Sequence, residues 1–192
     1  MKTLIYWRHS DKKGEVISQE GLDAAQIKAQ DTLKKYSISH VFAGALVRTW
    51  QTLCAIMGSL GIIAKVHEIV TEIGDNDQFQ NWKNAGAKFG SGTSNLNAAR
   101  QLPKSIFQQV CKNALEGVEK MFATMNELET GLIVGHSPVI EMAALAAGLD
   151  LNATQLETNE YIIFEKMSED PFNDKSGQII ASLLSDESDE RP

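Results

Sequence analysis

The chain has 192 residues, of which 43% are hydrophobic and 22% charged, and its formal net charge is −7. This length and this balance are typical of one globular domain with a hydrophobic core. The negative charge, with no stripe of Lys and Arg, excludes a general affinity for nucleic acid, so any phosphate-binding site has to be local.

The sequence shows no targeting or membrane-spanning segment. The apolar run from Met1 to Trp7 is short and meets Arg8 and His9, whereas a secretory signal has an apolar core of about 7–15 residues. No run approaches the roughly 18 apolar residues of a membrane span. Cys54 and Cys111 lie in apolar helical patterns without CxxC spacing, so we expect buried free thiols. We expect a cytoplasmic protein that has no membrane contact.

Short apolar segments alternate with helical patterns along the chain, which predicts a layered α/β domain with a mainly parallel sheet. In chain order the predicted strands are 3–7, 40–43, 65–69, 131–135, 161–164 and 178–184. The predicted helices are 19–36, 47–60, 103–128 and 139–147, each with apolar residues at helical spacing.

Residues 72–102 break this alternation. Their periodicity fails, and Asn, Gln, Gly, Ser and Asp accumulate around Phe79, Trp82 and Phe89. A long irregular stretch inside a compact domain is typical of a lid, a cap or disorder. We therefore expect a cap or lid segment at 72–102 within a single domain of residues 1–184. Residues 185–192 are acidic and are expected to form a solvated tail.

Two histidines and two arginines follow predicted strands. His9 comes directly after the first strand, and His136 directly after strand 131–135. Because ligands of open α/β sheets bind at the carboxyl ends of the strands, both imidazoles are expected to face one crevice. Arg8 adjoins His9, and Arg48 lies at the start of a helix, whose free N–H groups favour an anion. The four side chains predict a site for a dianionic phosphoryl group.

Four short motifs occur in order along the chain: Arg8-His9-Ser10; Ile17-Ser18 followed by Gly21 and Ala25-Gln26; Leu46 to Thr52; and Val134 to Pro138. They resemble the Arg-His-Gly signature, the start of the first helix, the second-arginine motif and the second-histidine motif of the histidine phosphatase (phosphoglycerate mutase-like) superfamily. The Gly-His-x-Pro form of the last is similar to that of small bacterial phosphohistidine phosphatases. The resemblance covers residues 3–147.

This resemblance implies a three-layer α/β/α sandwich and a phosphatase that needs no metal and no cofactor. His9 is then the nucleophile, because a neutral imidazole attacks phosphorus well and its pKa near 6.5 leaves the neutral form available. Arg8, Arg48 and His136 donate to the equatorial oxygens and stabilise their charge. Ser10 stands where the family has glycine and adds a hydroxyl beside the phosphate.

The general acid is expected in the interval after the third predicted strand. Glu68 and Glu72 both lie there, and Glu72 is followed by Gly74, which is closer to the family pattern. A carboxylic acid at this place protonates the leaving oxygen and then activates water against the phosphoenzyme. The sequence leaves the choice between the two open.

Other interpretations fit less well or remain open. Gly135-His136-Ser137 lacks the full Gly-x-Ser-x-Gly of a nucleophile elbow, and no histidine follows His136. Residues 86–92 lack the Gly-Lys-Ser/Thr ending of a phosphate loop.

Besides a hydrolase of phosphomonoesters or phosphohistidine, a mutase-like phosphoryl transferase and a catalytically silent phosphate or phosphoprotein binder remain open. The substrate is a phosphorylated small molecule or a phosphoprotein, and the sequence does not indicate an oligomeric state.

Overall fold

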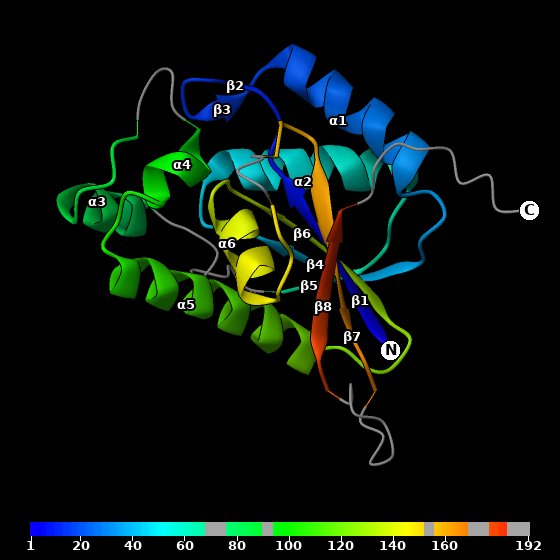
Figure 1. The fold of residues 1–192 in the computed structure, drawn as a ribbon. Helices are drawn as coiled ribbons and strands as arrows, with labels where there is room; N and C mark the ends of the chain where they lie inside the picture. The colour runs from blue at the N-terminus through cyan, green and yellow to red at the C-terminus, as the bar shows by residue number, and fades with distance from the viewer. Residues whose placement is uncertain (68–75, 90–93, 152–155, 169–176, 184–192) are drawn as a thin grey trace, which may run out of the picture.

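A computed structural model describes residues 1–67, 76–89, 94–151, 156–168 and 177–183. Its central sheet has the strand order β5-β4-β6-β1-β7-β8 (Figure 1). The strands are β1 (Lys2–Arg8), β4 (Ile38–Ala43), β5 (Lys65–Val66), β6 (Thr130–Gly135), β7 (Tyr161–Lys166) and β8 (Ile179–Leu183). A separate hairpin consists of β2 (Lys12–Lys13) and β3 (Val16–Ile17).

The sheet is mainly parallel, as predicted. Strands β5, β4, β6 and β1 pair in parallel, whereas β7 runs antiparallel to both β1 and β8. The carboxyl ends of β1, β4 and β6 therefore lie at one edge of the sheet. Because β7 runs in the opposite direction, its first residues arrive at that same edge.

Helices cover both faces of the sheet, which confirms the three-layer sandwich (Figure 1). The helices are α1 (Gln19–Thr32), α2 (Val47–Leu60), α3 (Asn76–Asn84), α4 (Asn95–Ala99), α5 (Lys104–Ala123) and α6 (Val139–Ala146). Helices α1 and α2 pack on one face, and α5 and α6 on the other. None of the helices in the described ranges is long and apolar enough to cross a bilayer.

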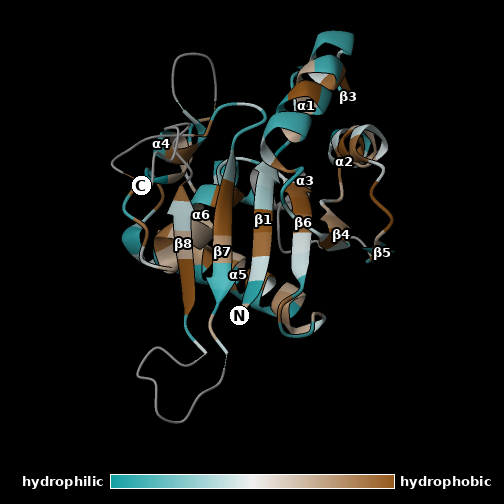
Figure 2. Cartoon of the chain, turned by 90° about the vertical axis from the view of Figure 1, so that its right-hand side faces the viewer, coloured by the Kyte–Doolittle hydropathy of each residue, from teal (hydrophilic) through white to brown (hydrophobic). Residues whose placement is uncertain are grey.

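The alternation of side chains along β1 supplies both layers of the core. Ile5 and Trp7 are fully buried against the face that α1 and α2 cover, whereas Leu4 and Tyr6 are fully buried against the opposite face. Successive residues of a strand point to opposite faces, so an unbroken apolar strand has to be covered on both sides. Figure 2 shows the strands side by side and hydrophobic along much of their length.

Gly135 allows Tyr6 to pack against the end of β6. A Cβ atom at Gly135 would lie 2.5 Å from Cε2 and 2.6 Å from the hydroxyl oxygen of Tyr6. We expect Gly135→Ala to lower the free energy of unfolding by about 1–3 kcal/mol, because the fully buried ring has no space to move into. Gly58→Ala is the matched control, since a Cβ at this position in the last turn of α2 meets nothing within 4 Å.

The control variant is expected to be as stable as the parent or more stable by about 0.5–1 kcal/mol, because alanine favours a helix over glycine. Urea unfolding of the three proteins measures both effects. Equal stability of the Gly135 variant and the parent protein would contradict the packing described for Tyr6.

Several predicted boundaries differ from the structure. Helix α1 ends at Thr32 and not at residue 36, because the chain turns there to enter β4. Helix α5 ends at Ala123 and not at residue 128: Leu128 has a positive φ of 67° and is 86% exposed. The apolar spacing that continued to Leu128 therefore belongs partly to the turn before β6.

The thiol of Cys111 is buried as expected, but Cys54 is exposed, which corrects the prediction of two buried thiols.

The described parts of 72–102 contain regular structure that the sequence did not predict. Helices α3 and α4 lie here, and Trp82 and Leu96 are buried in the core on the α5 side of the sheet. Helix α4 begins where the Ser94 hydroxyl accepts the N–H of Asn97. Both helices are too short to show an apolar periodicity over several turns. Residues 68–75, 90–93 and 184–192 lie outside the described ranges, and with them the acidic tail.

Candidate active site

His9 lies at the carboxyl end of β1 with its ring fixed in one tautomer. Its backbone N–H donates to the carbonyl of Gly135 at 3.1 Å, which ties β1 to the end of β6. The ring Nδ1 lies 2.7 Å from the carbonyl oxygen of Ser10. A carbonyl oxygen only accepts, so Nδ1 carries the proton and Nε2 carries the lone pair. Nε2 is therefore the nucleophilic atom of the ring.

Arg48 brings donors to that same atom. It lies in the first turn of α2, and its Nε donates to His9 Nε2 at 3.3 Å. Its Nη1 donates to Oε2 of Glu15 at 3.2 Å, in the turn of the β2–β3 hairpin. The guanidinium is only 12% exposed, whereas the Glu15 side chain is 76% exposed. Glu15 thus holds Arg48 through a solvated carboxylate, which an incoming phosphoryl group can replace.

His136 lies beside His9. It follows β6 directly, and the two ring centres are 5.0 Å apart in an edge-to-face arrangement. The imidazole of His136 is 1% exposed. Gly44, at the end of β4, lies next to it, because a Cβ there would be 3.5 Å from Nε2 of His136. The ends of β1, β4 and β6 therefore meet around the two imidazoles, as the sequence predicts.

Both imidazoles are held in the neutral form. Burial lowers the pKa of His9 to about 4, the bond with Ser10 opposes this shift, and the positive charges of Arg48, Arg8 and Lys12 add to it. Burial also lowers the pKa of His136 well below its usual value, with further lowering by His9 and Arg48. At neutral pH the lone pair on His9 Nε2 is therefore available for attack.

These lowered pKa values predict how stability depends on pH. Below about 6.5 the histidines of the unfolded chain bind protons, whereas folded His9 stays neutral down to about pH 4, so stability falls as the pH falls through this window. Each such histidine contributes a slope of up to about 1.4 kcal/mol per pH unit. Urea unfolding at several pH values, compared between the parent and His9→Asn, isolates the contribution of His9. Identical slopes in the two proteins would contradict the shift.

Arg8 is the last residue of β1, and its guanidinium is held by a backbone carbonyl. Its Nη1 donates to the carbonyl oxygen of Leu156, while its buried Nε has no acceptor among the described residues. Its charge lowers the pKa of both His9 and His136, so it acts on the two imidazoles. The structure thus brings together Arg8, His9, Arg48 and His136, as the sequence predicts.

Ser10 is fully buried and held on both sides. Its N–H donates to Oγ1 of Thr52 at 3.2 Å, and its hydroxyl donates to Oδ1 of Asn159. Asn159 also accepts a hydrogen bond from the Trp7 indole at 3.3 Å. The hydroxyl proton of Ser10 is therefore used in a hydrogen bond to a buried side chain. Thr52 and Asn159 fix the loop that follows His9.

Two further motif residues hold the hairpin beside Arg48. Oε1 of Gln51 accepts the N–H of Ile17 at 2.9 Å. A Cβ at Gly21 would lie 2.3 Å from the carbonyl oxygen of Asp11, so only glycine permits this close approach. The Gln51 contact places the β2–β3 hairpin, and with it Glu15, beside α2, and the Gly21 contact places the residue before the hairpin against α1. The candidate acids Glu68 and Glu72 lie outside the described residues.

Sequence reasoning missed four residues of the site: Thr52, Asn159, Glu15 and Glu141. Thr52 could have been found, because it lies one helical turn after Arg48 on the same face of α2. Glu141 also carries a signal, since it is the only charged residue in the apolar helix α6. Glu15 and Asn159 carry none, because a hairpin turn and the antiparallel strand β7 bring them to the site.

Comparison with known proteins agrees with this fold. Among solved structures, YhfR of Bacillus stearothermophilus matches with a TM-score of 0.63 and 18% identity, covering 95% of this chain and 96% of that one. A phosphoserine phosphatase from Entamoeba histolytica matches with a TM-score of 0.60 and 16% identity, covering 97% and 98%. A mycobacterial glucosyl-3-phosphoglycerate phosphatase matches with a TM-score of 0.56 and 15% identity, covering 95% and 97%.

At these identities the matches show the fold. No curated protein sequence matches the chain significantly. The family model of the histidine phosphatase superfamily (branch 1) matches residues 7–162, which include both histidines and both arginines of the site. This match covers most of the chain, so the chain belongs to the histidine phosphatase superfamily, as its motifs predict, and is an enzyme of the phosphatase class.

Proposed function

We propose that this chain is a metal-independent phosphomonoester hydrolase that works through a phosphohistidine on Nε2 of His9. The observation that carries the proposal is the tautomer of His9: Nδ1 donates to the Ser10 carbonyl, and the unprotonated Nε2 accepts a hydrogen bond from Nε of Arg48 at 3.3 Å. A nucleophilic lone pair and a cationic donor therefore converge where a phosphoryl group would sit. This pairing suits in-line attack on phosphorus.

In the first step Nε2 of His9 forms a bond to phosphorus while the ester oxygen leaves. The proton on Nδ1 stays bonded to the Ser10 carbonyl, which stabilises the positive charge of the phosphorylated ring. Arg48, Arg8 and His136 donate to the three remaining oxygens and stabilise their charge without a metal ion. These roles are part of the proposal, as is a contribution of Ser10 to the phosphate-binding set, for which its hydroxyl has to turn from Asn159 to the phosphate.

The leaving oxygen needs a proton, and we propose Glu72 or Glu68 as its source. The same carboxylate then removes a proton from water, which attacks the phosphohistidine and releases inorganic phosphate. His9 returns to its neutral form with Nδ1 protonated. Every proton is accounted for, and the cycle needs no further reactant.

The segment 72–102 is proposed as the cap that selects the substrate within the single domain of residues 1–184. Nδ2 of Asn95, in helix α4, donates to the carbonyl oxygen of Ser137 at 3.3 Å. Ser137 directly follows His136, so this segment reaches the site. The phosphoserine, glucosyl-3-phosphoglycerate and α-ribazole phosphatases of similar fold support a small phosphorylated molecule as substrate, with a phosphoprotein as the alternative.

The free thiols of Cys54 and Cys111 suit the cytoplasm, where we propose that the enzyme acts.

The test is phosphate release from an aryl phosphomonoester with a metal chelator present, combined with a rapid quench in base. We expect release that survives the chelator and a base-stable, acid-labile phosphoryl group on the peptide that contains His9. Release that requires a divalent metal would contradict the proposal. Transfer of the phosphoryl group to an added alcohol in place of water would favour a transferase, and binding of phosphate without release a silent binder.

A further inference from the structure

Glu141 is a buried carboxylate that the proposed reaction does not use. It lies in the first turn of α6, the helix that follows His136, and its side chain is completely buried. Burial raises its pKa, which hydrogen bonds and the charge of Arg8 partly oppose. A carboxylate in this position costs free energy unless it is well bonded, so its presence calls for a structural or functional reason.

The bonds of Glu141 join two separate segments of the site. Its Oε1 accepts the hydroxyl of Ser137 at 2.7 Å and the N–H of Leu156 at 3.1 Å. Ser137 adjoins His136, and the carbonyl oxygen of the same Leu156 accepts the guanidinium of Arg8. One oxygen atom therefore connects the turn after β6 with the segment that holds Arg8.

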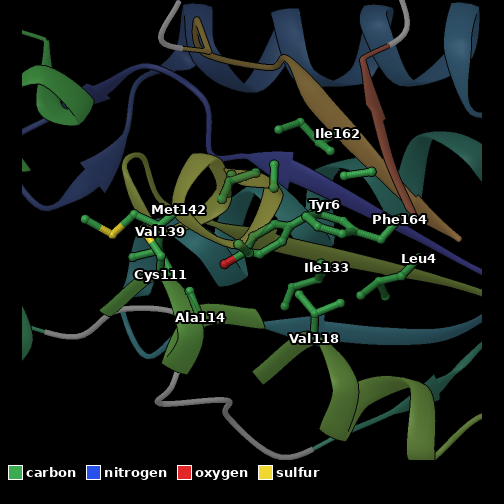
Figure 3. Packing of buried hydrophobic residues seen from close by; sticks show 14 of the residues in the cluster. Leu4, Tyr6, Cys111, Ala114, Val118, Ile133, Val139, Met142, Ile162 and Phe164 are labelled. Atoms are coloured by element: carbon green, nitrogen blue, oxygen red, sulfur yellow. The ribbon is translucent and has the colours of Figure 1, made fainter. Parts of the chain in front are cut away.

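Two further buried groups, Tyr6 and Arg8, interact electrostatically with Glu141. Oε2 of Glu141, Nε of Arg8 and the hydroxyl of Tyr6 are all buried without a hydrogen-bond partner among the described residues. Burial and, to a smaller extent, the charge of Glu141 raise the pKa of Tyr6, and the charge of Arg8 opposes the raised pKa of Glu141, so Tyr6 and Arg8 each interact with Glu141. Figure 3 shows the Tyr6 hydroxyl directed away from Phe164 and toward the helix that carries Val139 and Met142, which is α6.

We infer that Glu141 is a positioning residue. Through its bonds to Leu156 and Ser137 it fixes the positions of Arg8 and His136 relative to the phosphoryl group. It does not touch the reacting atoms. The inference rests on the proposed function, because it concerns how that site is held. Without the carboxylate, the N–H of Leu156 and the hydroxyl of Ser137 lose their acceptor inside the core, and the Leu156 segment loses its anchor. Arg8 then loses its fixed carbonyl partner.

The experiment compares Glu141→Leu with Glu141→Gln and with Met142→Ala as a matched control. Leucine removes the acceptor, whereas glutamine keeps a carbonyl oxygen at the same place. Met142 is equally buried, in the same helix, and belongs to the core beside α5. Three readouts apply to each variant: inhibition by inorganic phosphate, kcat and KM for an aryl phosphate, and the NMR signal of the Arg8 Nε–H group.

We expect Glu141→Leu to raise the inhibition constant of phosphate about tenfold and to shift or broaden the Arg8 signal, because a binding donor has lost its position. Glu141→Gln should stay within about threefold of the parent on every readout, since its carbonyl accepts the same two bonds. Met142→Ala should lose stability with phosphate inhibition unchanged. An unchanged Arg8 signal and unchanged phosphate inhibition in Glu141→Leu would overturn the inference. The inference would also fail if Met142→Ala weakened phosphate inhibition as much as Glu141→Leu does.

Ser137→Ala keeps the test decisive if Glu141→Leu fails to fold. It removes one of the two bonds to Oε1 and leaves the Leu156 bond intact. We expect kcat to fall about three- to tenfold through His136, with the Arg8 signal unchanged. An unchanged kcat would overturn the link to His136. If the parent binds phosphate but releases none from the aryl ester, the proposed function fails, while the dissociation constant of phosphate from calorimetry and the Arg8 signal still decide the role of Glu141.

Discussion

Replacing His9 by alanine is expected to lower kcat for an aryl phosphomonoester by about 10⁴-fold or more, because the reaction loses its nucleophile and its covalent intermediate. No described side chain could replace it, since the neighbouring imidazole of His136 is 1% exposed and its ring centre lies 5.0 Å away. The base-stable phosphoryl group should disappear at the same time. Single-turnover kinetics with a base quench measure both effects.

His40→Ala provides the matched control for the His9 variant. His40 is an imidazole outside the site, where its Nε2 lies 2.9 Å from Oε2 of Glu129 and its Nδ1 lies 2.7 Å from Nε2 of His67. Its removal should leave kcat within about threefold of the parent, because His40 pairs with Gly131 near the start of β6 and not with the end that meets the site. If His9→Ala kept more than a hundredth of the activity, phosphoryl transfer through His9 would be disproved.

Arg48→Ala is expected to lower kcat/KM by about 10²–10³-fold, because a buried donor aimed at the charge of the transition state is lost. Arg48→Lys should recover only part of this loss, since an ammonium cannot reproduce the forked donation of a guanidinium. Vanadate, which imitates the transition state, should bind the alanine variant more weakly by a similar factor. Steady-state kinetics and vanadate inhibition measure the effect.

Glu15→Gln separates the role of Arg48 from that of its ion pair. The variant removes the charge that competes for Nη1 of Arg48 and leaves the guanidinium in place. Phosphate should therefore inhibit this variant at a lower concentration than the parent. Equal loss of activity in the Glu15 and Arg48 variants would show that the ion pair, and not the donation to phosphate, is what the enzyme needs.

The sequence was sufficient to predict the arrangement around the two histidines. Buried parallel strands read as continuous apolar runs, and the residue after such a strand lies at a known edge of the sheet. For that reason His9 and His136 could be paired although 126 positions separate them in the chain. Arg8 adjoins His9 and Arg48 follows the second predicted strand, so both were expected at the same place, and the structure brings all four together.

The sequence was insufficient where contacts depend on register or on short elements. The bond between Ser10 and Asn159 exists because β7 runs antiparallel to β1, and apolar strand patterns do not reveal strand direction. The β2–β3 hairpin has strands of two residues, which are too short for an alternation of polar and apolar side chains. Helix boundaries were misplaced at Leu128 because apolar spacing can continue by chance into a turn.

The reversed direction of β7 has a consequence for how the enzyme is made. The last family motif ends at Pro138, yet the loop after His9 is held by Asn159, and the N–H of Arg8 donates to the carbonyl of Glu160 at 2.8 Å. During synthesis the chain emerges from the ribosome with its N-terminal part first. All four motifs are therefore exposed before the segment that fixes Arg8 and Ser10 exists. Phosphate-binding ability should appear only in nascent chains that have extended beyond β7.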